Sequence, residues 1–122
     1  MQTLVAVMLL VVGVVHLLPL GGVLGSRQLT RLYGLPFDEP NLAILIRHRA
    51  VLFGLLGVFF VYAAFSPDVQ ALALFAGFVS VGSFLALAHG SGTYNAAVRR
   101  VVAADLLALA CLVVAAATLL AS

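Results

Sequence analysis

Ionisable side chains occur inside stretches of this chain that are otherwise almost entirely apolar. His16, Arg49 and Asp105 each lie well within a long hydrophobic run. An Asp or Arg at the centre of a membrane-spanning helix costs about 2.5–3.5 kcal/mol, so such groups usually face the bundle interior and find partners. A histidine beside a carboxylate can carry a proton, and an arginine beside one can form an ion pair. These three residues are therefore the first candidates for chemistry.

The depth of these residues follows from the rise of an α-helix, about 1.5 Å per residue. Measured from the helix ends that carry the arginines, Arg49 lies about 10 Å deep, His16 roughly 13 Å and Asp105 roughly 15 Å. The three side chains can therefore meet in one layer and form a polar pocket. The remaining pocket candidates are expected nearer its mouth, and they are Arg47, His48, His89, Tyr94 and Asn95.

Several interpretations of the intramembrane polar residues stay open, and one of them is that Asp105 has no partner and only snorkels toward the membrane surface. An ion pair between Asp105 and Arg49 or Arg47 would lock two helices together and would be structural. A carboxylate without such a partner would instead accept a proton or bind a ligand. His16 has a similar ambiguity, because Pro19 removes a backbone hydrogen bond nearby, and a histidine at a kink can serve packing or ligand binding.

Several familiar kinds of site lack the residues they need. The histidines differ in estimated depth and have no spacing motif for haem, and a single cysteine, Cys111, excludes a multi-cysteine metal site. No serine or cysteine stands in a nucleophile-elbow context. The stretch from Gly90 to Gly92 lacks the strand, the helix and the lysine of a phosphate-binding loop. We assign no catalytic residue and no metal ligand, and the cofactor stays unknown, with haem and a quinone as alternatives.

Long apolar segments are the elements that must position these residues. The chain has 122 residues, of which 65% are hydrophobic and 8% charged, whereas a soluble domain carries about 25% charged residues. A helix needs roughly 20 apolar residues to cross a membrane, and an open sheet cannot satisfy its backbone in lipid. The sequence predicts an all-α polytopic membrane protein, a single domain over residues 1–122 with a bundle of four transmembrane helices at about 4–25, 42–65, 69–89 and 95–121.

The positive charges predict how this bundle is oriented. There is no lysine, and the six cations are Arg27, Arg31, Arg47, Arg49, Arg99 and Arg100. All of them fall on one side of the four-span topology, and short arginine-rich loops stay in the cytoplasm. The loop at 26–41 and the turn at 90–96 are therefore expected in the cytoplasm. Both termini are expected outside, in the periplasm of a Gram-negative host.

The cytoplasmic loop at 26–41 is expected to contain a short amphipathic helix at the membrane interface. Ser26 is a candidate N-cap, Leu29, Leu32 and Tyr33 share one face, and Gly34 would end the helix. Long arginine side chains reach from such positions to lipid headgroups. The expected membrane anchors are Arg27, Arg31, Arg99 and Arg100.

Four stretches of the chain resemble a family of small bacterial inner-membrane proteins. They are HLLPLGGVLG at 16–25, LYG at 32–34, RHRAVLFGLLG at 47–57 and YNAAVRRVVAAD at 94–105. In size and number of spans the chain is also similar to DoxX-type proteins, some of which work with quinone-linked oxidoreductases. This resemblance implies a four-helix fold and a place in the bacterial inner membrane, and it implies no activity.

These observations lead to one functional expectation with two alternatives. We expect a membrane module whose cytoplasm-facing pocket binds or passes a quinone, a lipid headgroup or a proton-coupled solute. The alternatives are an accessory subunit of a larger membrane complex and an intramembrane enzyme that uses His16 and Asp105 as an acid–base pair. Small residues at four-residue spacing, such as Ala73/Gly77 and Gly21/Gly25, indicate close helix packing and favour a homo-oligomer. No basic stripe interleaved with aromatic residues is present, so nucleic acid is not an expected partner.

Overall fold

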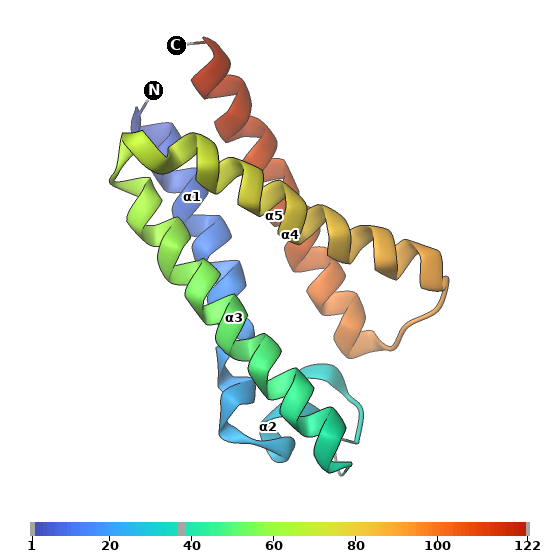
Figure 1. Cartoon of the computed structure of the whole chain (residues 1–122). Coiled ribbons are helices and arrows are strands. Elements are labelled where there is room, and N and C mark those ends of the chain that lie inside the picture. Colours follow the sequence, from blue (N-terminus) through green and yellow to red (C-terminus); the bar gives the residue numbers. More distant parts are fainter. Residues whose placement is uncertain (1, 37–38, 122) are drawn as a thin grey trace.

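The computed structural model describes residues 2–36 and 39–121, and this part of the chain is almost entirely helical (Figure 1). Its elements are α1 (Gln2–Leu17), η1 (Leu18–Leu24), α2 (Ser26–Tyr33), α3 (Pro40–Ala64), η2 (Pro67–Val69), α4 (Gln70–Ser91) and α5 (Ala96–Ala121). Four helical segments in this part are long and apolar enough to cross a membrane, and they are Gln2–Gly22, Pro40–Ala64, Pro67–Ser91 and Ala96–Ala121. The predicted all-α membrane bundle of four spanning helices is confirmed.

The first span is two helical segments rather than one. α1 gives way to the 3-10 helix η1 at Leu18, immediately before Pro19. Proline has no N–H for the α-helical hydrogen-bond ladder, and a tighter 3-10 turn accommodates it. Gly25 then takes a positive φ of 134°, which reverses the chain into α2.

The short helix α2 forms where the sequence predicts an amphipathic segment. Gly25, rather than Ser26, is its N-cap residue, and Gly34 ends it in the left-handed conformation at φ 68°. Leu29 is fully buried beneath the helix. The far end of α2 is tied to the start of α5, because Asn95 Nδ2 donates a hydrogen bond of 2.8 Å to the Tyr33 carbonyl oxygen. This clasp fixes where the side chains of α2 point.

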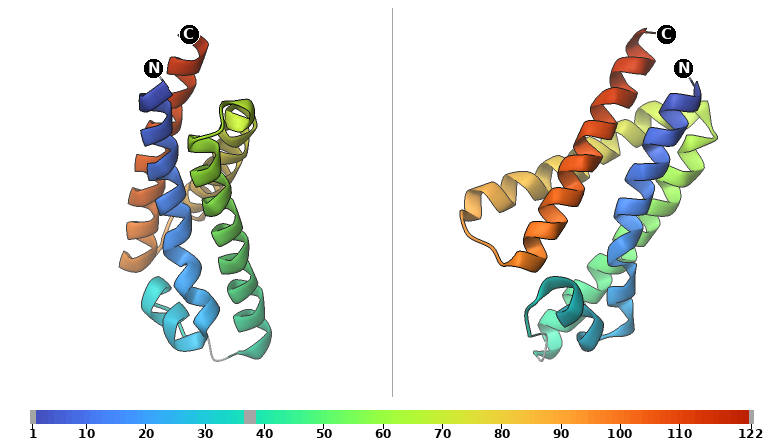
Figure 2. Two further views of the ribbon diagram at one scale, coloured as in Figure 1. Left: turned by 90° about the vertical axis from the view of Figure 1, so that its left-hand side faces the viewer. Right: turned by 180° about the vertical axis from the view of Figure 1, so that it is seen from behind.

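The four long helices pair unequally. α1 packs along α3 and α5, and α4 packs on α5, whereas α3 and α4 contact each other much less. The right-hand view of Figure 2 shows α3 and α4 joined at their turn and diverging away from it. The hydrophobic core lies mainly toward the end of the bundle that carries the termini, and its largest buried members include Phe60, Leu9, Leu112 and Val81. The opposite end, which holds α2 and the arginines, is therefore more open.

Glycines allow the close approach of α1 and α3. A Cβ atom on Gly57 would lie 3.0 Å from the Gly13 carbonyl oxygen, and one on Gly13 would lie 3.1 Å from the Gly57 carbonyl oxygen. Gly21, one of the glycines singled out in the sequence, has open space around it instead. The contact thus depends on a different pair of glycines from the one that four-residue spacing indicates.

Candidate ligand-binding cavity

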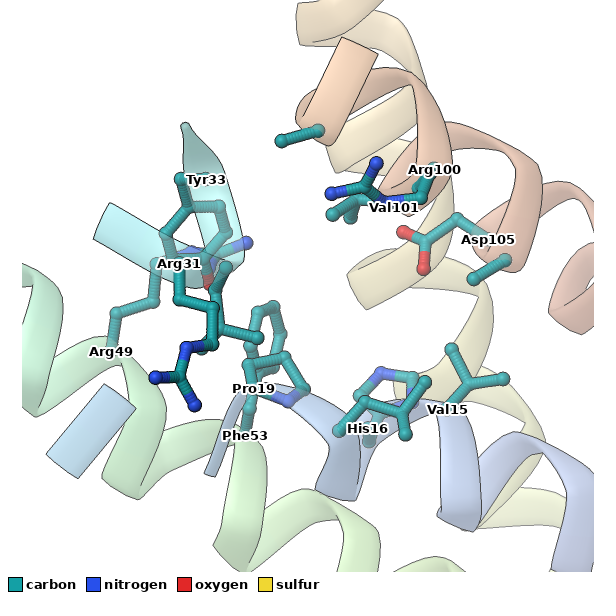
Figure 3. A pocket seen from close by; sticks show the side chains of 14 residues that line it. Val15, His16, Pro19, Arg31, Tyr33, Arg49, Phe53, Arg100, Val101 and Asp105 are labelled. Atoms are coloured by element: carbon teal, nitrogen blue, oxygen red, sulfur yellow. The ribbon is translucent and has the colours of Figure 1, made fainter. Parts of the chain in front are cut away.

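A cavity of about 350 Å³ opens between α1, η1, α2, α3 and α5 at the arginine-rich end. Ligand sites typically enclose about 300–1,000 Å³ and combine an apolar lining with a few polar groups. We call this cavity the polar cavity, because six polar side chains line it: His16, Arg31, Tyr33, Arg49, Arg100 and Asp105. Figure 3 shows Arg31, Tyr33 and Arg49 on one wall and Arg100 and Asp105 on the other, with His16 between them.

His16 is buried and both of its ring nitrogens are engaged. Nδ1 lies 2.9 Å from the Val12 carbonyl oxygen, which can only accept, so Nδ1 carries a proton. Nε2 of the neutral ring then accepts from the Ser80 hydroxyl at 2.8 Å. The ring also packs edge-on against Phe60, with centroids 4.8 Å apart, and against Phe53, with centroids 5.5 Å apart. His16 therefore links α1 to α4 in one defined tautomer.

Arg49 is held at the cavity wall by neutral partners. Its Nη1 donates a hydrogen bond of 2.7 Å to the Tyr33 hydroxyl. Its guanidinium carbon lies 4.2 Å from the centroid of the Phe53 ring, within the range of a cation–π contact. Phe53 follows Arg49 by one helical turn on α3, so both share one face. These contacts orient the guanidinium group, and neither contacting side chain carries a negative charge.

Asp105 lies half-buried on α5 and faces the cavity. Among the described residues it makes no hydrogen bond and no ion pair, so neither Arg49 nor Arg47 is joined to it directly. The helix-locking ion pair that the sequence left open is therefore not formed in this part of the chain. The carboxylate is available to a molecule in the cavity.

Two arginines assigned to headgroup anchoring line the cavity as well. Arg31 reaches it from α2 and Arg100 from α5, one helical turn before Ala104 on the same face. All four of these arginines are exposed, but Arg27 and Arg99 lie outside the lining formed by the described residues. The cavity thus faces three guanidinium groups and a single carboxylate.

Five of the pocket candidates from the sequence lie outside the cavity lining formed by the described residues. The exposed ones are Arg47, His48, His89 and Tyr94. The fifth, Asn95, supports the site indirectly: it holds Tyr33 by the clasp and caps α5 through a 2.8 Å hydrogen bond that its Oδ1 accepts from the Val98 N–H. Tyr33 is a cavity residue that the sequence did not single out, and its only signal was its place on the amphipathic face of α2.

No family or structural relative guides the interpretation of this cavity. Comparisons of the chain with protein families, with curated proteins and with solved structures found no match. Function is therefore inferred from the geometry of the cavity.

The metal-binding residue types are dispersed. Within residues 2–36 and 39–121, no three His, Cys, Asp or Glu side chains gather as a candidate metal site. His16 is enclosed by aromatic rings, whereas His48 and His89 are exposed on α3 and α4. What the cavity does offer is hydrogen-bond donors, positive charge and one carboxylate beside an apolar lining, a combination suited to binding a molecule with a polar end.

Proposed function

We propose that this chain is a multi-pass protein of a bacterial inner membrane that binds or passes a small or amphiphilic molecule in the polar cavity. The observation that supports this proposal is the convergence of His16, Arg49 and Asp105 from α1, α3 and α5 on one cavity. Apolar side chains complete the lining, among them Leu18, Phe53 and Val101. A quinone, a lipid headgroup or a proton-coupled solute has this mixture of polar and apolar parts.

The proposed orientation follows from the arginines. Arg27 and Arg31 lie on α2, Arg47 and Arg49 near the start of α3, and the remaining two near the start of α5. All of these segments are at the end of the bundle opposite the termini (Figure 1). By the positive-inside rule this end faces the cytoplasm and the termini face the periplasm. The cavity is then reached from the cytoplasm or the inner leaflet.

Binding is favoured over catalysis by the state of His16. A general base needs a free nitrogen within reach of its substrate, and both nitrogens of His16 are engaged by Val12 and Ser80. An acid–base role with Asp105 would require one of these hydrogen bonds to break first. An accessory subunit, alone or as a homo-oligomer, remains the alternative, in which the cavity holds no ligand.

Filling the cavity tests the proposal. Ala104 lines the cavity and Ala103, its neighbour on α5, is exposed outside it. We expect wild-type protein and Ala103→Phe, purified in mild detergent, to retain a small molecule detectable by mass spectrometry, and Ala104→Phe to lose it. Ala104→Leu provides a milder obstruction if the larger variant fails to fold. Equal recovery of every co-purifying molecule from all variants would contradict binding in the cavity and favour the accessory role.

A further inference from the structure

A second hollow adjoins the polar cavity. It lies between α3 and α4, has a volume of about 620 Å³, and we call it the lateral groove. Its lining is apolar apart from Arg49 and two serines, and it includes Leu52, Leu56, Phe75, Val79 and Phe84. Arg49 and Phe53 line both the groove and the cavity. A molecule could therefore occupy both spaces by passing these two side chains.

The lateral groove opens sideways from the bundle. α3 and α4 diverge from their turn (Figure 1). Phe75 is 68% exposed and Val79 is 54% exposed, so the groove is not covered by another part of the described chain. Because α3 and α4 both span the membrane, this opening faces acyl chains rather than water. Its apolar lining suits such a chain.

The polar cavity carries an excess of positive charge. Arg31, Arg49 and Arg100 face it together with a single carboxylate, Asp105. The two side chains that hold Arg49, Tyr33 and Phe53, carry no negative charge. Arg49 is only partly exposed, whereas Arg31 and Arg100 are exposed, and a cation withdrawn from water is costly unless an anion accompanies it. The guanidinium group presents its donors in a planar fork that matches a carboxylate or a phosphate.

We infer that the polar cavity and the lateral groove together bind an anionic amphiphile, either a fatty acid or an anionic phospholipid. Its carboxylate or phosphate group lies among Arg31, Arg49 and Arg100, and its acyl chain leaves past Phe53 into the lateral groove. This inference rests on the proposed function and names the ligand class. Asp105 opposes a simple anion by charge and accepts hydrogen bonds from a headgroup that carries hydroxyls.

Native mass spectrometry of the purified full chain in detergent can compare defined probes. The probes are oleate, dioleoylphosphatidylglycerol, dioleoylphosphatidylcholine and inorganic phosphate. We expect oleate or phosphatidylglycerol to bind at least about tenfold tighter than phosphatidylcholine. One good charge-assisted contact to the anionic group is enough to change the dissociation constant by about tenfold. The tighter of the two anionic lipids identifies the source of the anion. Equal affinity for phosphatidylcholine, or equally tight binding of phosphate alone, would overturn the inference.

Matched arginine variants test the position of the anionic group. Arg100 lines the cavity and Arg99, beside it, does not. We expect Arg100→Gln to weaken binding of the tighter anionic lipid about tenfold and Arg99→Gln to leave it within about twofold. Asp105→Asn should strengthen binding of oleate, opposite in sign to Arg100→Gln. An identical response to Arg99→Gln and Arg100→Gln would contradict this placement.

A second matched pair tests the acyl chain. Ser83 lines the lateral groove, and Ala86, also exposed on α4, does not. Ser83→Phe should weaken lipid binding about tenfold, and Ala86→Phe should change it less than about twofold. Unchanged affinity in Ser83→Phe would show that the chain lies elsewhere.

A neutral probe separates failure of this inference from failure of the proposed function. One outcome is that a short-tailed ubiquinone binds the wild-type protein but not Ala104→Phe, while the anionic lipids bind neither. The cavity is then a ligand site, and the anionic ligand class is wrong. If no probe responds to Ala104→Phe while that variant remains folded, the proposed function fails as well.

Discussion

At the residue scale, the site depends on how ionisable and polar side chains are satisfied inside an apolar bundle. His16 engages both of its nitrogens, Arg49 is held by a hydroxyl and an aromatic face, and Asp105 makes no hydrogen bond or ion pair among the described residues. Hydrogen bonds between membrane helices contribute little on average, about 0.6 kcal/mol and at most about 1.7 kcal/mol. The hydrogen bond between His16 and Ser80 therefore contributes little to the free energy of unfolding, and its main effect is to fix the orientation of the His16 ring at the cavity.

Removal of the Ser80 hydroxyl tests how much its hydrogen bond with His16 contributes to stability. We expect Ser80→Ala to lower the free energy of unfolding by about 0.6–1.7 kcal/mol, because Nε2 of His16 loses its partner. Unfolding in mixed detergent micelles measures this change. Ser83→Ala is the control, since its hydroxyl donates only to the Ser80 carbonyl of its own helix. A loss in the control as large as that in Ser80→Ala would argue against an inter-helix bond.

Counting helical rise was sufficient to place His16, Arg49 and Asp105 on one cavity, because the rise is nearly constant along a span. It could not find that Arg31, Tyr33 and Arg100 join them. Those positions depend on the rotation and docking of α2 and α5, which the Asn95 clasp sets through a contact 62 residues apart in the chain. Local sequence patterns do not encode that contact.

At the element scale, the spans themselves follow from apolar length, whereas their packing does not. The observed bounds agree with the predicted spans to within a few residues, apart from the change to a 3-10 helix at Leu18. The divergence of α3 from α4 was not predictable, because it depends on which helices pair. The close contact of α1 with α3 at Gly13 and Gly57 favours one such pairing.

A single methyl group should disrupt the contact between α1 and α3. In Gly57→Ala the new Cβ would lie 2.7 Å from Leu17 Cγ and 3.0 Å from the Gly13 carbonyl oxygen. Overpacking costs about 1–3 kcal/mol, which outweighs the gain of up to about 1 kcal/mol from helix propensity. We expect a net loss of unfolding free energy, measured in mixed micelles. Gly82→Ala, with open space around it, should be neutral or stabilising, and equal losses in both variants would contradict this account of the interface.

The start of α3 should respond to pH through Glu39. Its carboxylate accepts hydrogen bonds from the backbone N–H of Leu42 at 2.8 Å and of Asn41 at 3.1 Å. These bonds hold the pKa of Glu39 below its ordinary value. Because the folded pKa is depressed, the cap is fully present above the ordinary pKa and is lost as pH falls through the lowered one.

NMR titration in micelles can follow the amide signals of Asn41 and Leu42. We expect their midpoint to lie below the ordinary glutamate value and to vanish in Glu39→Gln. A midpoint at the ordinary value would mean that the carboxylate does not cap the helix in solution.

At the scale of the whole molecule, charge and shape act together. The arginines and the polar cavity occupy the end opposite the termini, and the main hydrophobic core occupies the other end. In the proposed orientation the arginine-rich end faces the cytoplasm, in keeping with the positive-inside rule. An anionic headgroup of the inner leaflet would then meet the cavity without crossing the bilayer.

Reporter fusions test the orientation in a bacterial host. Alkaline phosphatase, which is active only in the periplasm, should be active when fused after Ser122 and inactive when fused after Gly92. Green fluorescent protein, which folds in the cytoplasm, should show the reverse. A fusion after Ser122 that is active only in the cytoplasm would place the arginine-rich end outside and remove the basis for the proposed entry from the inner leaflet.

A crystal structure grown from a lipidic mesophase with a dibrominated stearate tests the central claim most directly. The account predicts electron density for the carboxylate among Arg31, Arg49 and Arg100, and anomalous bromine peaks in the lateral groove between α3 and α4. Bromine found only on the outer lipid-facing surface, with the polar cavity closed by its own side chains or filled by water, would contradict it.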